Sequence, residues 1–181
     1  GQIAEIGFSL YTELLERAVG SIRSGKIPDL DPSVRHGAEV ELHLPALIPE
    51  DYLPDVHARL TLYKRIASAR DEDALQELQV EMVDRFGVLP EQAKQLFTVA
   101  VLRLEATRLG LRKLDLGENG GRVHFQSQPN VDPMSVIRLI QSQPRVYSMD
   151  GPDKLRIRME LPDAASRLRT ARGLLQVLKT G

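Results

Sequence analysis

The spacing of apolar residues predicts that the first 110 residues are mainly helical. Apolar side chains recur there at intervals of three and four residues, the repeat of an amphipathic helix. The segments with this pattern are Phe8–Arg23, Pro54–Ala69, Asp71–Phe86 and Pro90–Leu109. The third has the clearest limits, because Asp71 can cap its first turn and Gly87 its last. Its predicted core stripe consists of Leu75, Leu78, Met82, Val83 and Phe86.

The last third alternates polar and apolar residues, which is typical of strands. Two hairpins are predicted: Leu111–Leu116 with Arg122–Ser127, and Val146–Met149 with Lys154–Met159. The first turn contains Asn119-Gly120, a strong hairpin signal. A helix should follow each hairpin, over Asp132–Gln143 and Asp163–Leu178. The order ββαββα favours an antiparallel sheet with helices on one face. The predicted class is therefore α+β, a helical N-terminal half packed with a small antiparallel sheet built from two hairpins.

A change in composition separates the first helix from the rest of the chain. Residues 26–38 are polar and contain two prolines, so we interpret them as a flexible linker. Glu39–Leu44 then alternates as a short strand, and prolines at 45, 49 and 54 keep the next connection extended. The expected organisation is a helical segment 1–25, the linker 26–38 and a domain over 39–181.

The amino-acid composition indicates the cellular compartment in which the protein works. The chain has no cysteine, which excludes disulfides, thiolate metal sites and a cysteine nucleophile. No apolar run reaches the roughly 18 residues that a membrane helix needs, and the first residues do not form a signal sequence. We therefore expect a cytoplasmic protein without membrane contact.

The net charge of −1 conceals an uneven distribution. Residues 1–100 contain 10 Lys and Arg against 17 Asp and Glu (10 − 17 = −7), whereas residues 101–181 contain 14 against 8 (14 − 8 = +6). The asymmetry fits an acidic contact face in one half and a basic one in the other. It equally fits two halves that neutralise each other within the fold.

No pattern in the chain indicates catalysis. The glycine-rich segment 117–121 lacks the Lys-Ser/Thr of a phosphate-binding loop and is interpreted as a turn. The histidines are isolated from one another, at positions 36, 43, 57 and 124, and form no metal-ligand pair. No serine lies in a nucleophile-elbow sequence. We therefore predict no enzyme activity, no catalytic residue, no cofactor and no metal.

Two groups of basic residues could bind nucleic-acid phosphates. They are Arg103, Arg108, Arg112 and Lys113, and Arg167, Arg169 and Arg172. Aromatic residues for base stacking are few, with four Phe, four Tyr and no Trp. Arginines that lie over the core or pair with local carboxylates explain these groups more simply.

An acidic stripe on the predicted helix Asp71–Phe86 is the strongest candidate site. Glu77, Glu81 and Asp84 are separated by four and three residues, so they share one face opposite the core stripe. Like charges at this spacing repel by roughly 0.2–0.5 kcal/mol per pair. A basic surface on another domain would relieve the repulsion. Pairing of Glu81 with Arg85, four residues later, is the simpler explanation.

Several ordered motifs resemble the C-terminal (TRCF) domain of the bacterial transcription-repair coupling factor Mfd. They are Leu44–Pro49, Tyr52–Val56, Arg59-Leu60, Tyr63–Ala67, Asp84–Gly87, Leu89-Pro90, Gly110–Leu114 and Asp150–Pro152. The match covers most of residues 39–160. Residues 7–19 are similar to the helix that ends the translocase module of that family, so segment 1–25 is expected to belong to it. The tail after Pro162 matches no motif.

The resemblance implies a non-catalytic regulatory module within a protein of nucleotide excision repair. In this family an ATP-dependent DNA translocase displaces RNA polymerase and recruits UvrA through a UvrB-like module. The C-terminal domain packs on that module, masks its UvrA-binding surface and is autoinhibitory. The matching acidic contacts are Glu81 and Asp84, and Glu77 joins them by spacing alone. The motor motifs are absent from this chain.

Two functions follow as expectations. The first is docking of the acidic helix on the UvrB-like module of the same polypeptide, with UvrA and RNA polymerase as indirect partners and no direct DNA binding. The alternative is a nucleic-acid-binding accessory domain that uses the basic C-terminal half.

Overall fold

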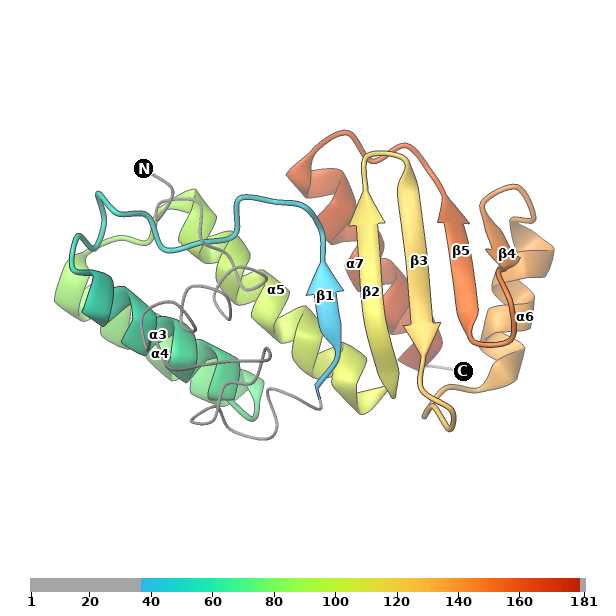
Figure 1. Cartoon of the computed structure of the whole chain (residues 1–181), viewed down its shortest axis with the longest axis horizontal. Coiled ribbons are helices and arrows are strands. Elements are labelled where there is room, and N and C mark those ends of the chain that lie inside the picture. The colour runs from blue at the N-terminus through green and yellow to red at the C-terminus, as the bar shows by residue number, and fades with distance from the viewer. Residues whose placement is uncertain (1–36, 180–181) are drawn as a thin grey trace, which may run out of the picture. The chain divides into compact units, whose positions relative to one another are not determined.

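A computed structural model of the chain describes residues 37–179, which form two compact units. One unit comprises residues 45–101, and the other combines residues 37–44 with residues 102–179. The predicted helix Phe8–Arg23 and the linker up to residue 36 lie outside the described residues. Figure 1 shows helices α3 and α4 in the first unit, the strands in the second, and α5 running through both.

The predicted helices of the first unit are confirmed. Helix α3 spans Val56–Ser68, α4 spans Glu72–Phe86 and α5 spans Glu91–Arg108. The side chain of Asp55 accepts a hydrogen bond from the His57 N–H at 3.1 Å, which caps the start of α3. Residue 54 is proline, which lacks a backbone N–H and disfavours the helical conformation in the residue before it, so it helps to fix where the helix begins.

A buried hydrogen bond attaches the proline-rich connection to α3. The Ile48 N–H donates to the hydroxyl of Tyr63 at 2.7 Å, and both residues are buried. The N–H of the preceding residue, Leu47, donates to the carbonyl of Gln92 at 3.1 Å. Because these backbone groups lie away from water, the hydrogen bonds hold the connection against the helices.

One charged residue in this core was not predicted to be buried. The side chain of Arg59 is 2% exposed, and its Nη1 donates to the carbonyls of Leu53 at 2.5 Å and Pro54 at 3.0 Å. These carbonyls precede α3, where the chain turns into the helix. Arg59 therefore fixes the approach of the chain to α3 through backbone acceptors.

The second unit contains a five-stranded sheet in the order β1-β2-β3-β5-β4. Its strands are β1 Glu39–Glu41, β2 Leu111–Gly117, β3 Gly120–Phe125, β4 Tyr147–Met149 and β5 Lys154–Arg158. Both predicted hairpins are present and antiparallel. The first strand adds an edge that the hairpin pattern did not predict: β1 pairs in parallel with β2, Val40 opposite Leu114, so the sheet is mixed.

The two C-terminal helices complete the predicted ββαββα order. Helix α6 spans Pro133–Ser142 and α7 spans Ala164–Lys179, and Figure 1 shows α7 behind the sheet. Alternate strand residues are buried on one side of the sheet, among them Leu114, Val123 and Leu155. Since α7 contributes Ala171 and Leu174 to the buried set, the core of this unit lies between helix and sheet.

The turn predicted at 117–121 is confirmed as the β2–β3 hairpin. Gly117 pairs with Gly120, and Gly120 has a positive φ of 103°, which glycine adopts without steric cost. A Cβ on Gly121 would overlap the carbonyl oxygen of Asp115 on the neighbouring strand. These glycines therefore serve the close approach of strands.

Across residues 37–179, no helix combines the length and the apolar character that a membrane crossing requires.

Candidate functional site

Helix α4, which carries the predicted acidic stripe, is fixed at both ends. The side chain of Asp71 accepts a hydrogen bond from the Ala74 N–H at 2.8 Å, as its predicted capping role requires. At the other end Gly87, with a φ of 98°, donates its N–H to the carbonyl of Val83 at 2.9 Å. The hydroxyl of Tyr52 also donates to the Gly87 carbonyl, at 2.8 Å. These contacts fix where α4 begins and ends, and therefore which of its residues lie on the outer side.

Aromatic contacts support the C-terminal end of α4. The rings of Tyr52 and Phe86 meet edge to face, with centroids 6.1 Å apart. The guanidinium of Arg85 lies 4.7 Å from the centroid of the Phe86 ring, within the range of a cation–π interaction. Arg85 is thereby held at the edge of the acidic stripe.

Two of the three predicted site residues face solvent. Glu77 and Asp84 are exposed, and neither side chain makes an ion pair or hydrogen bond with any other residue between 37 and 179. The buried side of the helix is formed by Leu75, Leu78 and Met82, as predicted. Glu77 and Asp84 therefore have carboxylates available to a partner.

Glu81 differs from the other two because it is already paired. Arg65, on α3, donates from Nη1 and Nη2 to the two carboxylate oxygens of Glu81, at 2.6 and 2.8 Å. Arg85 adds a third hydrogen bond, from Nη1 to Oε2 at 3.1 Å. The Arg65 hydrogen bonds, helped by Arg85, lower the pKa of Glu81 to about 2. The carboxylate is thus ionised and links α3 to α4.

The sequence indicated the Arg85 pair by its four-residue spacing but gave no sign of the Arg65 pair. Arg65 and Glu81 lie on different helices, 16 residues apart. Their meeting depends on the packing of α3 against α4, which periodicity within one helix cannot reveal.

The prediction that Val83 belongs to the core stripe is wrong. Val83 is 42% exposed, and Val80, one turn earlier, is 52% exposed. Val88, just after the helix, is 82% exposed. The apolar stripe is narrower than expected because Leu75, Leu78 and Met82 already fill the contact with the rest of the unit. The outer side of α4 therefore carries apolar side chains as well as carboxylates.

In the second unit, the members of the first predicted basic group, residues 103, 108, 112 and 113, differ in burial and in their ion-pair partners. Burial lowers the pKa of Arg103. Arg112 donates to Asp153 at 2.7 Å, and the Nζ of Lys113 lies 3.9 Å from a carboxylate oxygen of Glu39. These contacts are with local carboxylates, and the group does not form one continuous basic surface.

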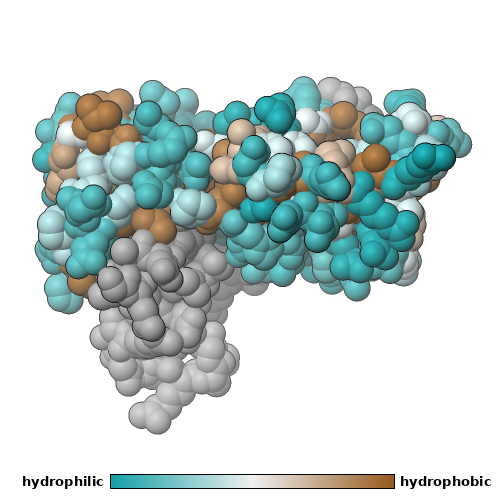
Figure 2. Space-filling view, turned by 90° about the horizontal axis from the view of Figure 1, so that it is seen from above, coloured by the Kyte–Doolittle hydropathy of each residue, from teal (hydrophilic) through white to brown (hydrophobic). Residues whose placement is uncertain are grey.

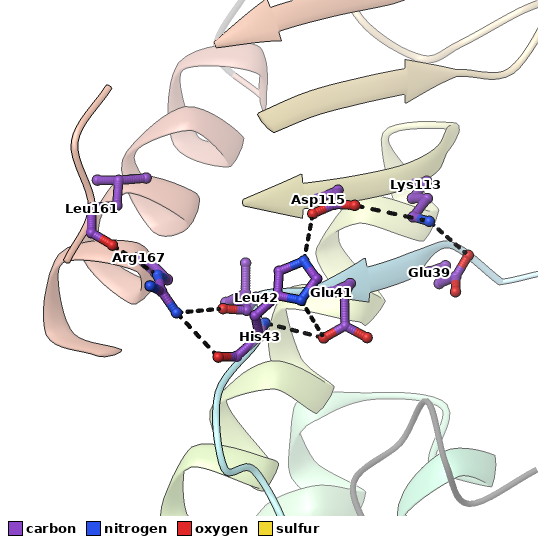
Figure 3. Close-up of polar contacts among 8 residues, drawn as sticks. All are labelled: Glu39, Glu41, Leu42, His43, Lys113, Asp115, Leu161 and Arg167. Atoms are coloured by element: carbon purple, nitrogen blue, oxygen red, sulfur yellow. Dashed lines mark hydrogen bonds and ion pairs between the residues drawn. The ribbon is translucent and has the colours of Figure 1, made fainter. Parts of the chain in front are cut away.

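The second basic group contains an arginine with a structural role. Arg167 of α7 donates to the carbonyls of Leu161 at 2.8 Å, Leu42 at 3.3 Å and His43 at 3.1 Å, and Figure 3 shows its guanidinium directed at these backbone oxygens. Leu42 lies next to the edge strand β1. Arg167 therefore holds the end of β1 against the C-terminal helix.

The imidazole of His43 occupies the other side of the same cluster (Figure 3). Its Nε2 lies 2.9 Å from a carboxylate oxygen of Asp115, and its backbone N–H donates to Glu41 at 3.0 Å. His43 has a φ of 54°, in the left-handed region that glycine favours. The side-chain and backbone contacts together hold the chain in this conformation.

The exposed side of the sheet also carries a weakly basic histidine. The pKa of His124 is lowered by burial and by the nearby charges of Lys154, Lys113 and Arg112. Its strand neighbours Lys113 and Lys154 stand on either side of it in register. Within residues 37–179, no three His, Asp or Glu residues gather in a way that could hold a metal ion.

The second unit also contains a depression that could hold a small molecule. It has a volume of about 530 Å³ and is lined by the end of α5, residues 129–132 and the end of α7. Its charged lining residues are Glu105, Arg108, Asp132 and Lys179. The lining contains no histidine or serine to serve as base or nucleophile. The most completely formed candidate site therefore remains the outer side of α4, which can recognise a surface.

An α+β domain that presents an acidic and apolar helix face matches known proteins in both sequence and fold. The chain belongs to the TRCF domain family, whose model matches residues 42–136. It is 44% identical over 179 residues to the transcription-repair-coupling factor of Escherichia coli strain K12, covering 99% of this chain and 16% of the relative. The factor of Haemophilus influenzae is also 44% identical, over 178 residues, with 98% and 16% covered.

The fold is similar to a solved crystal structure of the C-terminal domain of transcription-repair coupling factor. The TM-score is 0.63 at 17% sequence identity, and the alignment covers 80% of this chain and 95% of that one. The chain thus spans about one sixth of the length of these two curated relatives. The α+β class predicted from the sequence is confirmed.

Proposed function

We propose that this chain is the autoinhibitory C-terminal domain of a transcription-repair coupling factor and has no catalytic activity of its own. It docks through the outer face of α4 on the UvrB-like module of the same polypeptide and masks the surface that binds UvrA. UvrA and RNA polymerase are then indirect partners, and ATP-driven translocation belongs to another part of the protein. Residues 1–25 connect to that motor, and the linker predicted over residues 26–38 ends before Gly37, because Ala38 is buried in the second unit and donates its N–H to Thr107 at 2.9 Å.

The observation that carries this proposal is the pair of exposed carboxylates on a fixed helix. Glu77 and Asp84 project from the same side of α4 and have no cationic partner within residues 37–179. Family membership supports the choice of partner, because the resemblance assigns the docking contact to this helix. A basic surface would gain charge-assisted hydrogen bonds here without disturbing the core of the domain.

Reversal of the carboxylates tests the proposal. We expect the chain to bind the isolated UvrB-like module in titration calorimetry, and the double variant Glu81→Lys/Asp84→Lys to lose at least tenfold in affinity, about 1.4 kcal/mol. Glu77→Lys should weaken binding as well. Glu118→Lys, an exposed reversal in the β2–β3 turn, is the matched control and should bind as the unmodified chain does. Raising the salt concentration should weaken the interaction.

The nucleic-acid alternative makes the opposite prediction. Arg156 and Arg158 are exposed on the open side of the sheet, yet Glu39, Asp115 and Asp150 also lie in this part of the second unit. Tight binding to a 20-base-pair duplex that is unaffected by the α4 reversals would overturn the docking proposal in favour of this alternative.

A further inference from the structure

Helix α6 leaves most of its apolar side chains uncovered. Of its five large apolar residues only Leu139 is buried, whereas Met134 is 48% and Ile137 is 40% exposed. The other two, at positions 136 and 140, are half-buried. The second buried residue of the helix is polar, namely Ser135. Packing within the second unit therefore does not account for the apolar side chains of this helix.

The uncovered side chains form a ridge along one side of α6. Met134, Ile137 and Ile140 follow one another at intervals of three residues, so this α6 ridge extends over about 9 Å, or about two turns. Arg138 follows Met134 by four residues and adjoins the ridge. Figure 2 shows hydrophobic residues reaching the surface among hydrophilic ones, and an isolated residue of that kind needs no explanation. Several on one side of a helix are instead typical of a contact site.

Hydrogen bonds fix both ends of α6. At its start the carboxylate of Asp132 accepts the N–H of Met134 at 2.9 Å. At its end the carbonyl of Gln143 accepts the N–H groups of Val146 and Tyr147, at 3.0 and 2.9 Å. The chain then continues into the edge strand β4, and Figure 1 shows α6 at that end of the sheet. The α6 ridge is therefore formed before any partner binds, which lowers the entropic cost of binding.

The charges next to the α6 ridge are all positive. Residues 133–149 contain Arg138 and Arg145 but no Asp or Glu. Both arginines are exposed, and neither side chain makes an ion pair or hydrogen bond with any other residue between 37 and 179. The acidic residues that adjoin this segment are engaged, Asp132 in the helix cap and Asp150 in an ion pair at 2.7 Å. The surface thus combines an apolar ridge with two guanidiniums that lack a carboxylate.

We infer that the α6 ridge binds a protein segment whose apolar side chains are flanked by aspartate or glutamate, on a partner other than a second copy of this chain. A helix with apolar residues at three- and four-residue spacing matches a ridge of two turns. Carboxylates beside those residues form charge-assisted hydrogen bonds with Arg138 and Arg145. Pairing the α6 ridges of two copies would instead bring these arginines together without a carboxylate, which is repulsive.

Fluorescence polarisation with labelled peptides tests the charge of the partner. The acidic probe is a designed peptide of about 20 residues, long enough to form a helix, with leucine at helical spacing and glutamate beside each leucine. The basic probe has lysine in place of every glutamate. Because an interface of two helical turns is small, chain concentrations up to about 0.5 mM are needed. At 50 mM NaCl we expect the acidic probe to bind at least tenfold more tightly than the basic probe.

Substitutions on α6 test where the acidic probe binds. Ile137→Ser should weaken its binding at least fivefold at both 50 and 500 mM NaCl, because salt screens charges but does not weaken apolar burial. Arg138→Glu should weaken its binding at 50 mM only, and should strengthen binding of the basic probe. Val88→Ser and Arg70→Glu, which are exposed in the first unit, are the matched controls and should leave the affinity for both probes unchanged.

Several outcomes would overturn the inference. They are the absence of binding by the acidic probe, equal affinity for the two probes, and binding that neither α6 substitution changes. Self-association in sedimentation that Ile137→Ser abolishes would assign the α6 ridge to a second copy, and binding to phosphatidylglycerol vesicles that Ile137→Ser abolishes would assign it to a lipid surface. Circular dichroism establishes that each variant is folded. Because α6 and α4 belong to different units, none of these outcomes bears on the proposed docking through α4.

Discussion

Replacing Tyr63 with phenylalanine should destabilise the first unit by removing one hydrogen bond from its interior. The ring of Tyr63 is 1% exposed, and its hydroxyl accepts the Ile48 N–H at 2.7 Å. Phenylalanine preserves the ring but leaves this N–H without an acceptor in a site where Ile48 is 0% exposed. An unsatisfied buried donor costs about 1–3 kcal/mol. At roughly 2–4 °C per kcal/mol, the expected loss in melting temperature is about 2–12 °C.

The same burial gives the residue a spectroscopic signature. Desolvation raises the pKa of Tyr63 to about 12, so its hydroxyl stays neutral after ordinary tyrosines have ionised. An unfolded tyrosine ionises near pH 10, and stability should therefore decline as the pH rises from about 10 to about 12. A shift of about two pKa units corresponds to about 3 kcal/mol. The Tyr63→Phe variant should lack this part of the alkaline loss.

Urea unfolding followed by circular dichroism measures the change at pH 7, and absorbance at high pH follows the tyrosine ionisation. Tyr52→Phe is the control, because the shorter hydrogen bond of its hydroxyl, at 2.8 Å, is donated to the carbonyl of Gly87 at an exposed site, where water can replace the hydroxyl. Its cost should be below about 1 kcal/mol. A Tyr63→Phe variant within about 0.5 kcal/mol of the unmodified chain, or simultaneous ionisation of all tyrosines, would refute the reasoning.

Two further predictions concern charge and backbone contacts. Carbon NMR titration should find that Glu81 ionises near pH 2. The stabilising contribution of its ionised carboxylate is therefore present above the ordinary carboxyl pKa and disappears as the pH falls through about 2. Arg65→Ala should raise the pKa of Glu81, and an unchanged pKa would contradict the Arg65–Glu81 pairing. Gly121→Ala should separate β2 from β3, because the added methyl group overlaps the Asp115 carbonyl. Amide exchange in β2 should then become faster, whereas Gly173→Ala, where nothing stands within 4 Å of the added atom, should leave it unchanged.

Local signals allowed most elements to be predicted from the sequence. Asp71 and Gly87 define α4 because a capping side chain and a left-handed glycine act on their own neighbours. Asn119-Gly120 likewise defines the hairpin. The parallel pairing of β1 with β2 could not be predicted in this way, because Val40 and Leu114 are far apart in the sequence and alternation alone does not identify a partner.

The candidate site was predictable only in part. Helical spacing placed Glu77 and Asp84 on the outer side of α4, where both are exposed. The same reasoning wrongly assigned Val83 to the core. A hydrophobic residue at the edge of a helical stripe is buried only if another element covers it, and spacing along one helix does not show whether one does. The ion pair between Arg65 and Glu81 depends on how α3 packs against α4. A one-dimensional pattern contains no information on either contact.

The edge strand β1 affects the order in which the two units can fold during synthesis. Residues 39–41 leave the ribosome before the whole of the helical unit, yet their hydrogen-bonding partners are residues 113–115. Until those later residues emerge, the backbone groups of this segment cannot be satisfied by the sheet, and closing such a long loop slows folding. The helical unit therefore has time to fold first, as an insertion between two pieces of its neighbour. A fragment that begins at Pro45 would contain every helix of this region and still leave β2 with an unpaired edge, open to association with other chains.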